Sequence, residues 1–324
     1  MRSKTANLKE SEIIELATQC GYECERAIAL KLEASGREYW RLIYNSNHLV
    51  LCFLDKSNGN HLEFCNLAEM LSSYNVNVPK VLLHNPELGI TIQEDLGDDD
   101  LLEILNESNK TELTHKSLEL LIQIQEIPNL DVQNLSADEL LDQISLFSEV
   151  FCKQFLEIEA DKSILELSAA TIKNLSDHPK LNCHFDFERR NLIASEANVI
   201  SVIDFQDLCI GPIGIDLAGI LLDHYLIFDE SFVKDSLAFY KTKSAVDLNA
   251  DELFECFRWG GIQRNMRILG TLSRLYMNNK RSFRLNDLPM ILDNLINILP
   301  NNWSCKNYML DTIKPRLTEK LASL

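Results

Sequence analysis

The sequence predicts an α+β fold with two lobes, an antiparallel β-sheet lobe followed by a helical lobe. Three observations predict it. Short segments rich in β-branched and aromatic residues lie within residues 1–95. From residue 101 onward, apolar residues recur mainly at helical spacing. One polar loop and one β-branched strand, within residues 182–207, interrupt the helical part. The composition, 46% hydrophobic and 25% charged, is that of a globular chain.

The N-terminal lobe is expected to begin with a helix over residues 9–20, because Ile13, Leu16, Ala17 and Cys20 fall on one side. A small-residue turn, residues 33–37, separates the first two expected strands. A second helix is expected over residues 62–74. Strands are expected over residues 27–31, 38–44, 49–54, 78–83 and 90–93.

The lobe boundary is predicted at the segment Glu94-Asp95-Leu96, which ends the sheet. The acidic residues 98–100 can cap a helix that begins near Leu101. The prediction is therefore an N-terminal lobe of residues 1–95 and a C-terminal lobe of residues 96–324. Helices in the second lobe are expected over residues 101–105, 111–125, 136–156, 163–174, 216–228, 232–240, 251–277 and 288–299.

The stretch 182–207, NCHFDFERRNLIASEANVISVIDFQD, carries the strongest functional signal. Asp186 lies two residues after His184, Asn191 follows after four intervening residues, and Asp204 ends an apolar strand. This order and spacing is typical of a phosphoryl-transfer site. Asp186 is the candidate base for the attacking hydroxyl, in a loop expected to follow a helix. Asn191 and Asp204 are the candidate oxygen ligands of Mg²⁺. His184 is interpreted as a hydrogen-bonded core residue.

With this motif, the sheet lobe and the helical lobe indicate a protein-kinase-like two-lobe fold. One feature of that fold is missing, because a protein kinase has a lysine on its third strand that contacts the nucleotide phosphates. Here that strand reads LVLCFL, and the first lysine, Lys56, lies past its end. Glu63 and Glu69 on the next helix are possible acidic partners for such a lysine. A catalytically weak pseudokinase that acts as a binding module therefore stays an alternative.

The bulk properties exclude several classes of partner. The net charge of −18 disfavours nucleic acid and anionic membranes as main partners. No stretch reaches the roughly 18 apolar residues of a membrane span, and we expect a cytoplasmic protein. The nine cysteines are scattered without a CxxC pair, which favours reduced thiols over zinc or disulfides. The oligomeric state is left open.

The segments CHFDFERRNLI, VISVIDFQDLCIGPIGIDLAGILLD and EDLG resemble the aminoglycoside phosphotransferase and choline-kinase superfamily. Within it, the nearest resemblance is to the bacterial kinases of cell-wall amino sugars. Gln206 stands where a protein kinase has glycine, which argues against a protein substrate. The resemblance extends to WGGIQR, LGTLSR and NDLP in the later helices and is loosest in the N-terminal lobe.

This resemblance implies ATP or GTP as the phosphoryl donor and Mg²⁺ as the metal. It implies as acceptor the anomeric hydroxyl of N-acetylmuramate or N-acetylglucosamine. An aminoglycoside or a choline-like alcohol is the alternative acceptor. Ser35, Gly36 and Arg37 lie where the family has a nucleotide loop whose backbone N–H groups could cover the phosphates, although an ordinary turn is an equal reading. Glu94, Asp95 and Leu96 are expected to offer backbone groups to adenine. The residues expected to contact the acceptor are Asp223, Arg190, Gln206 and Arg264.

The helix over residues 251–277 also carries a basic stripe, in which Gln263, Arg264, Arg267 and Arg274 fall within a roughly 100° arc. Two interpretations were equally supported by the sequence. The stripe is either a solvated helix face with salt bridges within the helix, or a set of cations that meets an anionic substrate group. The apolar residues Ile262, Met266, Leu269, Leu272 and Tyr276 are expected on the opposite side.

Overall fold

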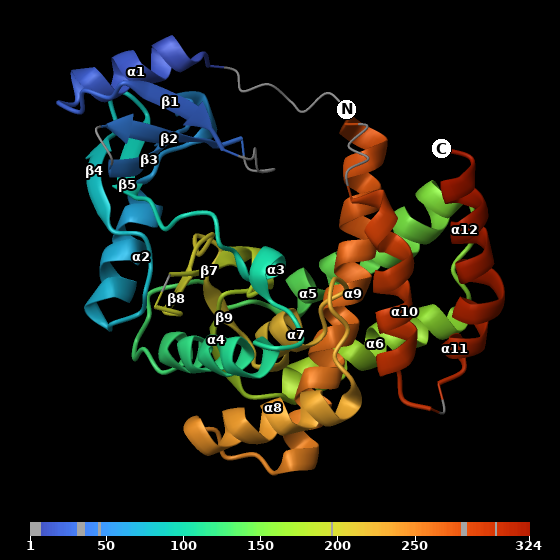
Figure 1. Cartoon of the computed structure of the whole chain (residues 1–324). Coiled ribbons are helices and arrows are strands. Elements are labelled where there is room, and N and C mark those ends of the chain that lie inside the picture. The colour runs from blue at the N-terminus through green and yellow to red at the C-terminus, as the bar shows by residue number, and fades with distance from the viewer. Residues whose placement is uncertain (1–7, 31–35, 45–46, 196, 280–283, 302) are drawn as a thin grey trace. The chain divides into compact units, whose positions relative to one another are not determined.

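The computed structural model describes residues 8–324 except residues 31–35, 45–46, 196, 280–283 and 302. The chain divides into two compact units (Figure 1). Unit 1 contains residues 1–103 and 191–206, and unit 2 contains residues 104–190 and 207–324. The segment that carries Asn191 and Asp204 therefore belongs to the same unit as the N-terminal sheet. The predicted boundary of the lobes at residues 95/96 stays a prediction.

Unit 1 is built on a five-stranded antiparallel sheet in the order β1-β2-β3-β5-β4. Its strands are β1 (Arg26–Ala29), β2 (Glu38–Tyr44), β3 (Asn47–Phe53), β4 (Val81–Asn85) and β5 (Ile90–Glu94). Its helices are α1 (Glu10–Gln19), a 3₁₀ turn (Lys56–Asn58), α2 (Leu62–Ser73) and α3 (Leu101–Ile104). A small hairpin completes the unit, with β7 (Leu192–Ala194) paired to β8 (Ile200–Val202).

The two faces of the five-stranded sheet differ in chemistry. Side chains alternate between the faces along each strand. Ile13 and Ala17 of α1 pack on one face, in a core with Trp40, Leu42 and Leu51. The apolar residues in the alternating pattern of β2 face this core. The sequence predicted β2 with the same first and last residues that the structure shows.

Unit 2 is mainly helical. Its first half contains α4 (Lys110–Gln125), α5 (Ala137–Leu146), a π-helical segment (Phe147–Leu156), α6 (Lys162–Asp177), β6 (Lys180–Cys183) and a 3₁₀ turn (Arg189–Asn191). Next come β9 (Cys209–Pro212), α7 (Gly214–Leu221), α8 (Glu230–Lys243) and α9 (Ala250–Asn279). The chain ends with a 3₁₀ turn (Leu285–Asp287), α10 (Leu288–Ile298), α11 (Cys305–Tyr308), a π-helical turn (Met309–Ile313) and α12 (Lys314–Ala322).

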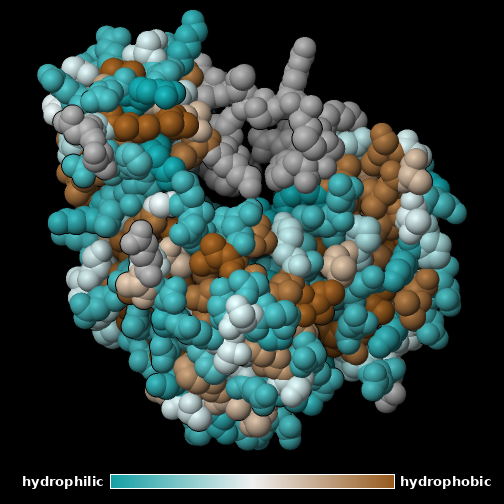
Figure 2. Space-filling model, viewed as in Figure 1, coloured by the Kyte–Doolittle hydropathy of each residue, from teal (hydrophilic) through white to brown (hydrophobic). Residues whose placement is uncertain are grey.

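Helix α9 is the central element of unit 2 and packs closely against α7. A Cβ atom on Gly260 would lie 2.2 Å from the backbone of Gly214, and one on Gly214 would lie 1.8 Å from the Cys256 carbonyl oxygen. Only glycine allows two helix backbones to approach this closely. The same helix contributes Ile262, Met266, Leu269 and Leu272 to the main core, as the sequence predicted. Figure 2 shows mainly hydrophilic residues, in teal, over the face in view, with hydrophobic residues in brown between them.

Three expectations about local structure were wrong. The helix expected over residues 216–228 ends at Leu221, because the Asp223 carboxylate accepts the Tyr225 N–H at 2.9 Å and forms a turn instead. The loop that carries Asp186 follows strand β6 and not a helix. Finally, β6 pairs with β9 in the helical part, a strand pair that was not predicted. All nine cysteines are free thiols, as predicted.

Candidate active site

The position of Asp186 is fixed by strand β6 and by the carboxylate of Asp216. β6 pairs with β9, and the side-chain amide of Asn182 donates to the carbonyl oxygens of Ile124 (2.9 Å) and Ile127 (2.8 Å) at the end of α4. Directly after β6, the backbone N–H groups of His184 and Phe185 donate to Asp216 at 2.6 and 2.9 Å. Asp216 lies in the first turn of α7. The turn before Asp186 is therefore tied to a helix in the core of unit 2.

Asp216 serves this structural role from a buried position, because it is only 1% exposed. Burial raises its pKa, while the nearby His184 and the N–H groups of His184 and Phe185 act in the opposite direction. Gly219, one turn later in α7, lets the loop pack against the helix. A Cβ atom there would lie 2.3 Å from the Phe187 carbonyl oxygen.

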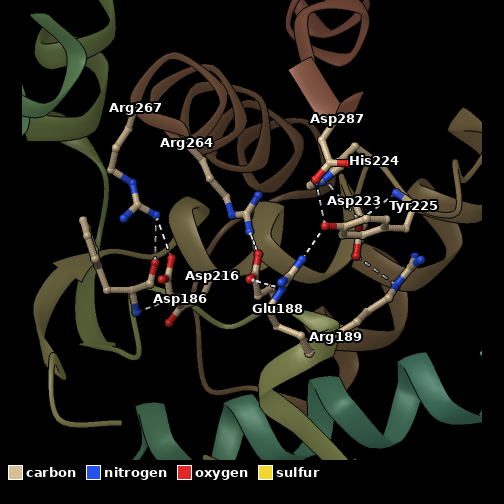
Figure 3. Close-up of polar contacts among 12 residues, drawn as sticks. Asp186, Glu188, Arg189, Asp216, Asp223, His224, Tyr225, Arg264, Arg267 and Asp287 are labelled. Carbon is tan, nitrogen blue, oxygen red and sulfur yellow. Dashed lines mark hydrogen bonds and ion pairs between the residues drawn. The ribbon is translucent and has the colours of Figure 1, made fainter. Parts of the chain in front are cut away.

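The carboxylate of Asp186 is held by Arg267 of α9. The Arg267 guanidinium donates to Asp186 Oδ1 at 2.9 Å, and the Asp186 side chain keeps 45% of its surface exposed (Figure 3). Burial tends to raise the pKa of Asp186, but the charges of Arg267 and Arg264 outweigh it and lower the pKa below its usual value. At neutral pH Asp186 is therefore an oriented, half-exposed carboxylate.

A separate chain of ion pairs is centred on Glu188, in the same loop as Asp186 (Figure 3). Arg264 donates to Glu188 Oε2 at 2.5 Å, and the Arg190 Nε atom lies 2.9 Å from Glu188 Oε1. Arg264 is 2% exposed and Glu188 is 9% exposed. The Arg190 guanidinium also contacts the Tyr225 hydroxyl and lies 5.4 Å from the centre of its ring.

The loop between α7 and α8 carries the far end of this chain. The Tyr225 hydroxyl donates to Asp287 at 3.0 Å, and the Arg284 Nε atom donates to the same oxygen at 3.1 Å. His224 Nε2 lies 3.5 Å from Asp287. Burial tends to raise the pKa of Asp287, but hydrogen bonds from His224 and Arg284 outweigh it and lower the pKa to about 2.

Asp223 takes part in a second, deeply buried ion pair. Its carboxylate lies 3.4 Å from the Nε atom of Arg189, and the two side chains are 5% and 2% exposed. The Arg189 guanidinium also lies over the ring of Phe228, 4.6 Å from its centre. Asp223 therefore anchors the 3₁₀ turn that contains Arg189 to the loop before α8.

The basic stripe of α9 resolves into buried and exposed residues. Gln263 and Arg264 are 0% and 2% exposed, whereas Arg274 is exposed. Arg264 and Arg267 pair with Glu188 and Asp186, which belong to the loop after β6. Of the two interpretations of the stripe, the solvated face with salt bridges within the helix is therefore wrong for Gln263, Arg264 and Arg267, and contact with an anionic substrate group stays a prediction.

Asn191 and Asp204 come together in unit 1, at the open end of the β7–β8 hairpin. The Ile203 N–H donates to the Asn191 carbonyl oxygen at 2.9 Å, and Asp204 follows in the left-handed conformation, with φ 61°. The Gln206 amide donates to Asp204 Oδ1 at 2.7 Å. Between them, the Phe205 ring stacks on Phe64 of α2 at 4.9 Å. The hairpin and the stacked rings together hold Asp204 in place.

This arrangement fits a nucleotide-bound Mg²⁺. Among the residues that the structure describes, no three His, Cys, Asp or Glu side chains form a metal-binding group. Mg²⁺ bound to phosphates requires fewer, since one or two protein oxygens are completed by phosphate and water. Asn191 and Asp204 supply such oxygens, and the buried Gln206 Oε1 beside them has no hydrogen-bond partner. An unsatisfied oxygen at this place favours a cation.

The remaining predicted residues lie in unit 1. Gly36 is exposed with φ 77°, and Ser35 lies outside the described residues. Glu94 ends β5, and the Asp95 carboxylate accepts from Arg41 at 2.5 and 3.0 Å. Leu96 follows in a segment without regular secondary structure.

Sequence reasoning gave no role to several residues of the ion-pair chain in unit 2. Glu188 had a weak signal, since it is the acid between Asp186 and two arginines in the loop. Asp287 lies in a motif that was noted only for its resemblance. The unassigned residues are Glu188, Arg189, Tyr225, Arg284 and Asp287.

Comparison with known proteins agrees with this geometry. The family model described as "Phosphotransferase enzyme family" matches residues 27–251. The chain belongs to this family. It is 31% identical over 283 residues to the N-acetylmuramate/N-acetylglucosamine kinase of Neisseria meningitidis serogroup B. The aligned region covers 81% of this chain and 82% of that protein.

Solved structures of this family share the fold. Choline kinase LicA from Streptococcus pneumoniae superposes with a TM-score of 0.63 and 17% identity, over 89% of this chain and 98% of that one. Spectinomycin phosphotransferase APH(9)-Ia, in complex with ADP and spectinomycin, superposes with a TM-score of 0.63 and 14% identity. The superposition covers 95% of this chain and 100% of that one. The predicted α+β kinase-like fold is confirmed. Within the described residues, no helix of this phosphotransferase is long and apolar enough to cross a membrane.

Proposed function

We propose that this chain is a kinase that transfers the γ-phosphoryl group of ATP to a hydroxyl group of N-acetylmuramate or N-acetylglucosamine. The observation that carries the proposal is the Asp186 carboxylate, held ionised and half-exposed by Arg267. The name of the Neisseria relative supports the amino-sugar acceptor. GTP is the alternative donor, and the anomeric hydroxyl is the expected point of attack. Because the donor is a nucleoside triphosphate, we place the reaction in the cytoplasm.

In this reaction Asp186 accepts a hydrogen bond from the acceptor hydroxyl and orients it. The hydroxyl oxygen forms a bond to the γ-phosphorus, the bond to the bridging oxygen of ADP breaks, and the proton passes to Asp186. Because Arg267 and Arg264 keep the pKa of Asp186 low, it is a weak base. A weak base suits a loose transition state, in which orientation and charge matter more than early proton removal.

We propose Asn191 and Asp204 as the ligands of Mg²⁺. When bound, Mg²⁺ neutralises charge on the β- and γ-phosphate oxygens. The Gln206 amide, which donates to Asp204, orients that carboxylate, although the sequence suggested a role for Gln206 at the acceptor. The backbone of Glu94, Asp95 and Leu96 stays the proposed adenine-binding segment, and Ser35 and Gly36 stay the proposed nucleotide loop.

For the acceptor, we propose Arg190 as a contact residue, because its side chain is partly exposed beside Tyr225. Arg264 and Asp223 are buried in ion pairs with Glu188 and Arg189. We therefore propose that these two residues act on the acceptor by holding their partners in place.

The test is an acceptor panel with Mg²⁺ and ATP, read by ADP release and by phosphorus NMR of the product. The panel contains N-acetylmuramate, N-acetylglucosamine, choline and several aminoglycosides. We expect turnover with the amino sugars and a product signal coupled to the anomeric proton. Turnover with choline or an aminoglycoside but with neither amino sugar would show that the proposed acceptor is wrong. No turnover above the Asp186→Asn variant with any compound would mean that the chain is not a kinase for these acceptors.

A further inference from the structure

The third strand of the sheet, β3, carries no lysine for the phosphates of a nucleotide. Lys56, the nearest lysine after the strand, is not a substitute. Its side chain is 57% exposed and pairs with Glu87 at 3.2 Å. A triphosphate on a chain with 49 acidic residues and 31 basic residues nevertheless requires a cation besides Mg²⁺.

The sheet face opposite α1 is the polar face. The register pairs Tyr39 of β2 with Cys52 of β3, and Cys52 with Thr91 of β5, so these three side chains share that face. Thr91 is 0% exposed, and its hydroxyl has no hydrogen-bond partner. The Oε1 atom of Gln93, which is 7% exposed two residues along β5, also lacks a partner. Polar groups of this kind are typical of a face that meets a ligand.

Arg37 belongs to the same face. It precedes Glu38, whose side chain is 3% exposed on the α1 side and accepts the Leu8 N–H. By the alternation of side chains, Arg37 points to the side of Tyr39. Its charge acts to lower the pKa values of Tyr39, Cys52 and His61, so the guanidinium lies within electrostatic range of these three side chains.

Asp204 lies close to the same tyrosine. Burial raises the pKa of Tyr39 well above its usual value, Asp204 adds to this rise, and Arg37 opposes it. The candidate metal ligand and Arg37 therefore both lie within electrostatic range of one hydroxyl, in one compact unit. Burial lowers the pKa of the neighbouring His61 to about 4, with a smaller contribution from Arg37. His61 is neutral at pH 7, which leaves Arg37 as the cation beside Tyr39.

Arg37 also lacks the partner that comparable arginines have. Arg37 makes no ion pair with a described residue. Its buried Nε atom has no hydrogen-bond partner among the described residues, a state that the Nε atoms of several paired arginines share. Every other buried or partly buried arginine in the described chain has a carboxylate within 4.0 Å. These are Arg41, Arg189, Arg190, Arg258, Arg264, Arg267, Arg284 and Arg316. A partly buried cation without an anion is costly, so the missing partner is an anion from outside the described chain.

We propose that Arg37 binds the phosphate groups of the nucleoside triphosphate, in place of the lysine that β3 lacks. The planar guanidinium can donate two hydrogen bonds to one phosphate group. Arg37 would then neutralise part of the triphosphate charge, in addition to the Mg²⁺ that Asn191 and Asp204 would hold. This inference rests on the proposed kinase function and adds a specific phosphate-binding residue to it.

The test compares Arg37→Gln, Arg37→Lys and the control Arg26→Gln with the unaltered chain. Arg26 is an exposed arginine of the same sheet, with its side chain 67% exposed. Binding of AMP-PNP with Mg²⁺ is measured by titration calorimetry, and binding of adenosine by ligand-observed NMR. Circular dichroism melting shows which variants are folded.

We expect Arg37→Gln to weaken AMP-PNP binding by roughly 10- to 100-fold, the typical effect of losing a charge-assisted hydrogen bond. Adenosine binding should not change, Arg37→Lys should recover part of the affinity, and Arg26→Gln should have no effect. Equal AMP-PNP affinities for Arg37→Gln and the unaltered chain would overturn the role of Arg37 and leave the kinase proposal intact. An unaltered chain that binds no nucleotide would overturn both. If Arg37→Gln does not fold, the Arg37→Lys variant tests the proposal. Because the lysine ammonium lacks the planar, two-donor geometry of the guanidinium, this variant should bind AMP-PNP several-fold more weakly than the unaltered chain.

Discussion

In unit 2 the charged side chains around Asp186 are paired with one another, whereas in unit 1 Arg37 has no carboxylate partner among the described residues. Arg264, Glu188 and Arg190 form one continuous set, and Arg267 holds Asp186. Near Asp204 of unit 1, by contrast, Gln206 Oε1 has no partner. We infer that the charged residues around Asp186 in unit 2 are preorganised by the protein alone, whereas Arg37 and Gln206 in unit 1 are completed by the proposed ligands.

The largest predicted effect separates catalysis from nucleotide binding. Asp186→Asn should lower kcat by about 10³-fold, because general-base catalysis by a positioned side chain contributes roughly 10²–10⁴. AMP-PNP affinity should not change, since Asp186 belongs to unit 2. Asp235→Asn, an exposed aspartate on α8, is the control and should retain full activity. A large loss of AMP-PNP affinity in Asp186→Asn would contradict this separation of the two halves.

The second prediction compares two arginines by stability. Arg264→Met should lower the free energy of unfolding by about 3 kcal/mol, because it leaves Glu188 buried with one fewer partner. Arg37→Met should leave it unchanged or raise it, because this arginine has no ion pair with a described residue to lose. Urea denaturation of both variants measures the difference. Equal losses in the two variants would show that Arg37 does have a partner within the folded chain.

The third prediction concerns the frame that keeps unit 2 preorganised. Gly260→Ala should cost about 2 kcal/mol or more, because its Cβ atom would lie 2.2 Å from the Gly214 backbone. The neighbouring change Gly261→Ala is the control. Its Cβ atom would come closest to the end of the Leu222 side chain, at 2.7 Å, which can move, and its next contacts, at 3.6 and 3.8 Å, are ordinary side-chain contacts. Thermal melting of both variants is the measurement, and a larger loss for Gly261→Ala would contradict the close helix crossing.

Much of this fold could be predicted from sequence because its signals are local. Strand β2 was predicted with its observed bounds, since alternating residues face the α1 core and the polar side. The helix expected after Asp216 ended early, because a turn at Asp223 has no periodic signal. The pairing of β6 with β9 was missed, since the two strands are short and far apart in the chain.

The candidate site shows the same division between local and distant signals. The spacing of Asp186, Asn191 and Asp204 is visible in one stretch of sequence. The pair of Arg264 and Glu188 joins residues 76 positions apart, so only the folded chain shows that this arginine is buried. Only the folded chain shows that Arg37 has no carboxylate partner among the described residues, because a sequence with this many acids offers a partner for any arginine.

The smallest predicted effect is a pH dependence specific to unit 2. Hydrogen bonds from His224 and Arg284 lower the folded-state pKa of Asp287 to about 2, against an ordinary value of 3.8. A carboxylate with a lowered pKa stabilises the fold above its unfolded pKa, and this stability is lost as the pH falls through the folded pKa. The contribution, about 1 to 2 kcal/mol, should therefore be full above pH 4 and disappear between about pH 4 and pH 2. Asp287→Asn should be less stable than the unaltered chain at pH 6 and nearly equal to it at pH 2, in urea titrations across this range. A stability difference that stays constant from pH 6 to pH 2 would mean that His224 and Arg284 do not stabilise the Asp287 carboxylate, and that this end of the ion-pair chain is not preorganised.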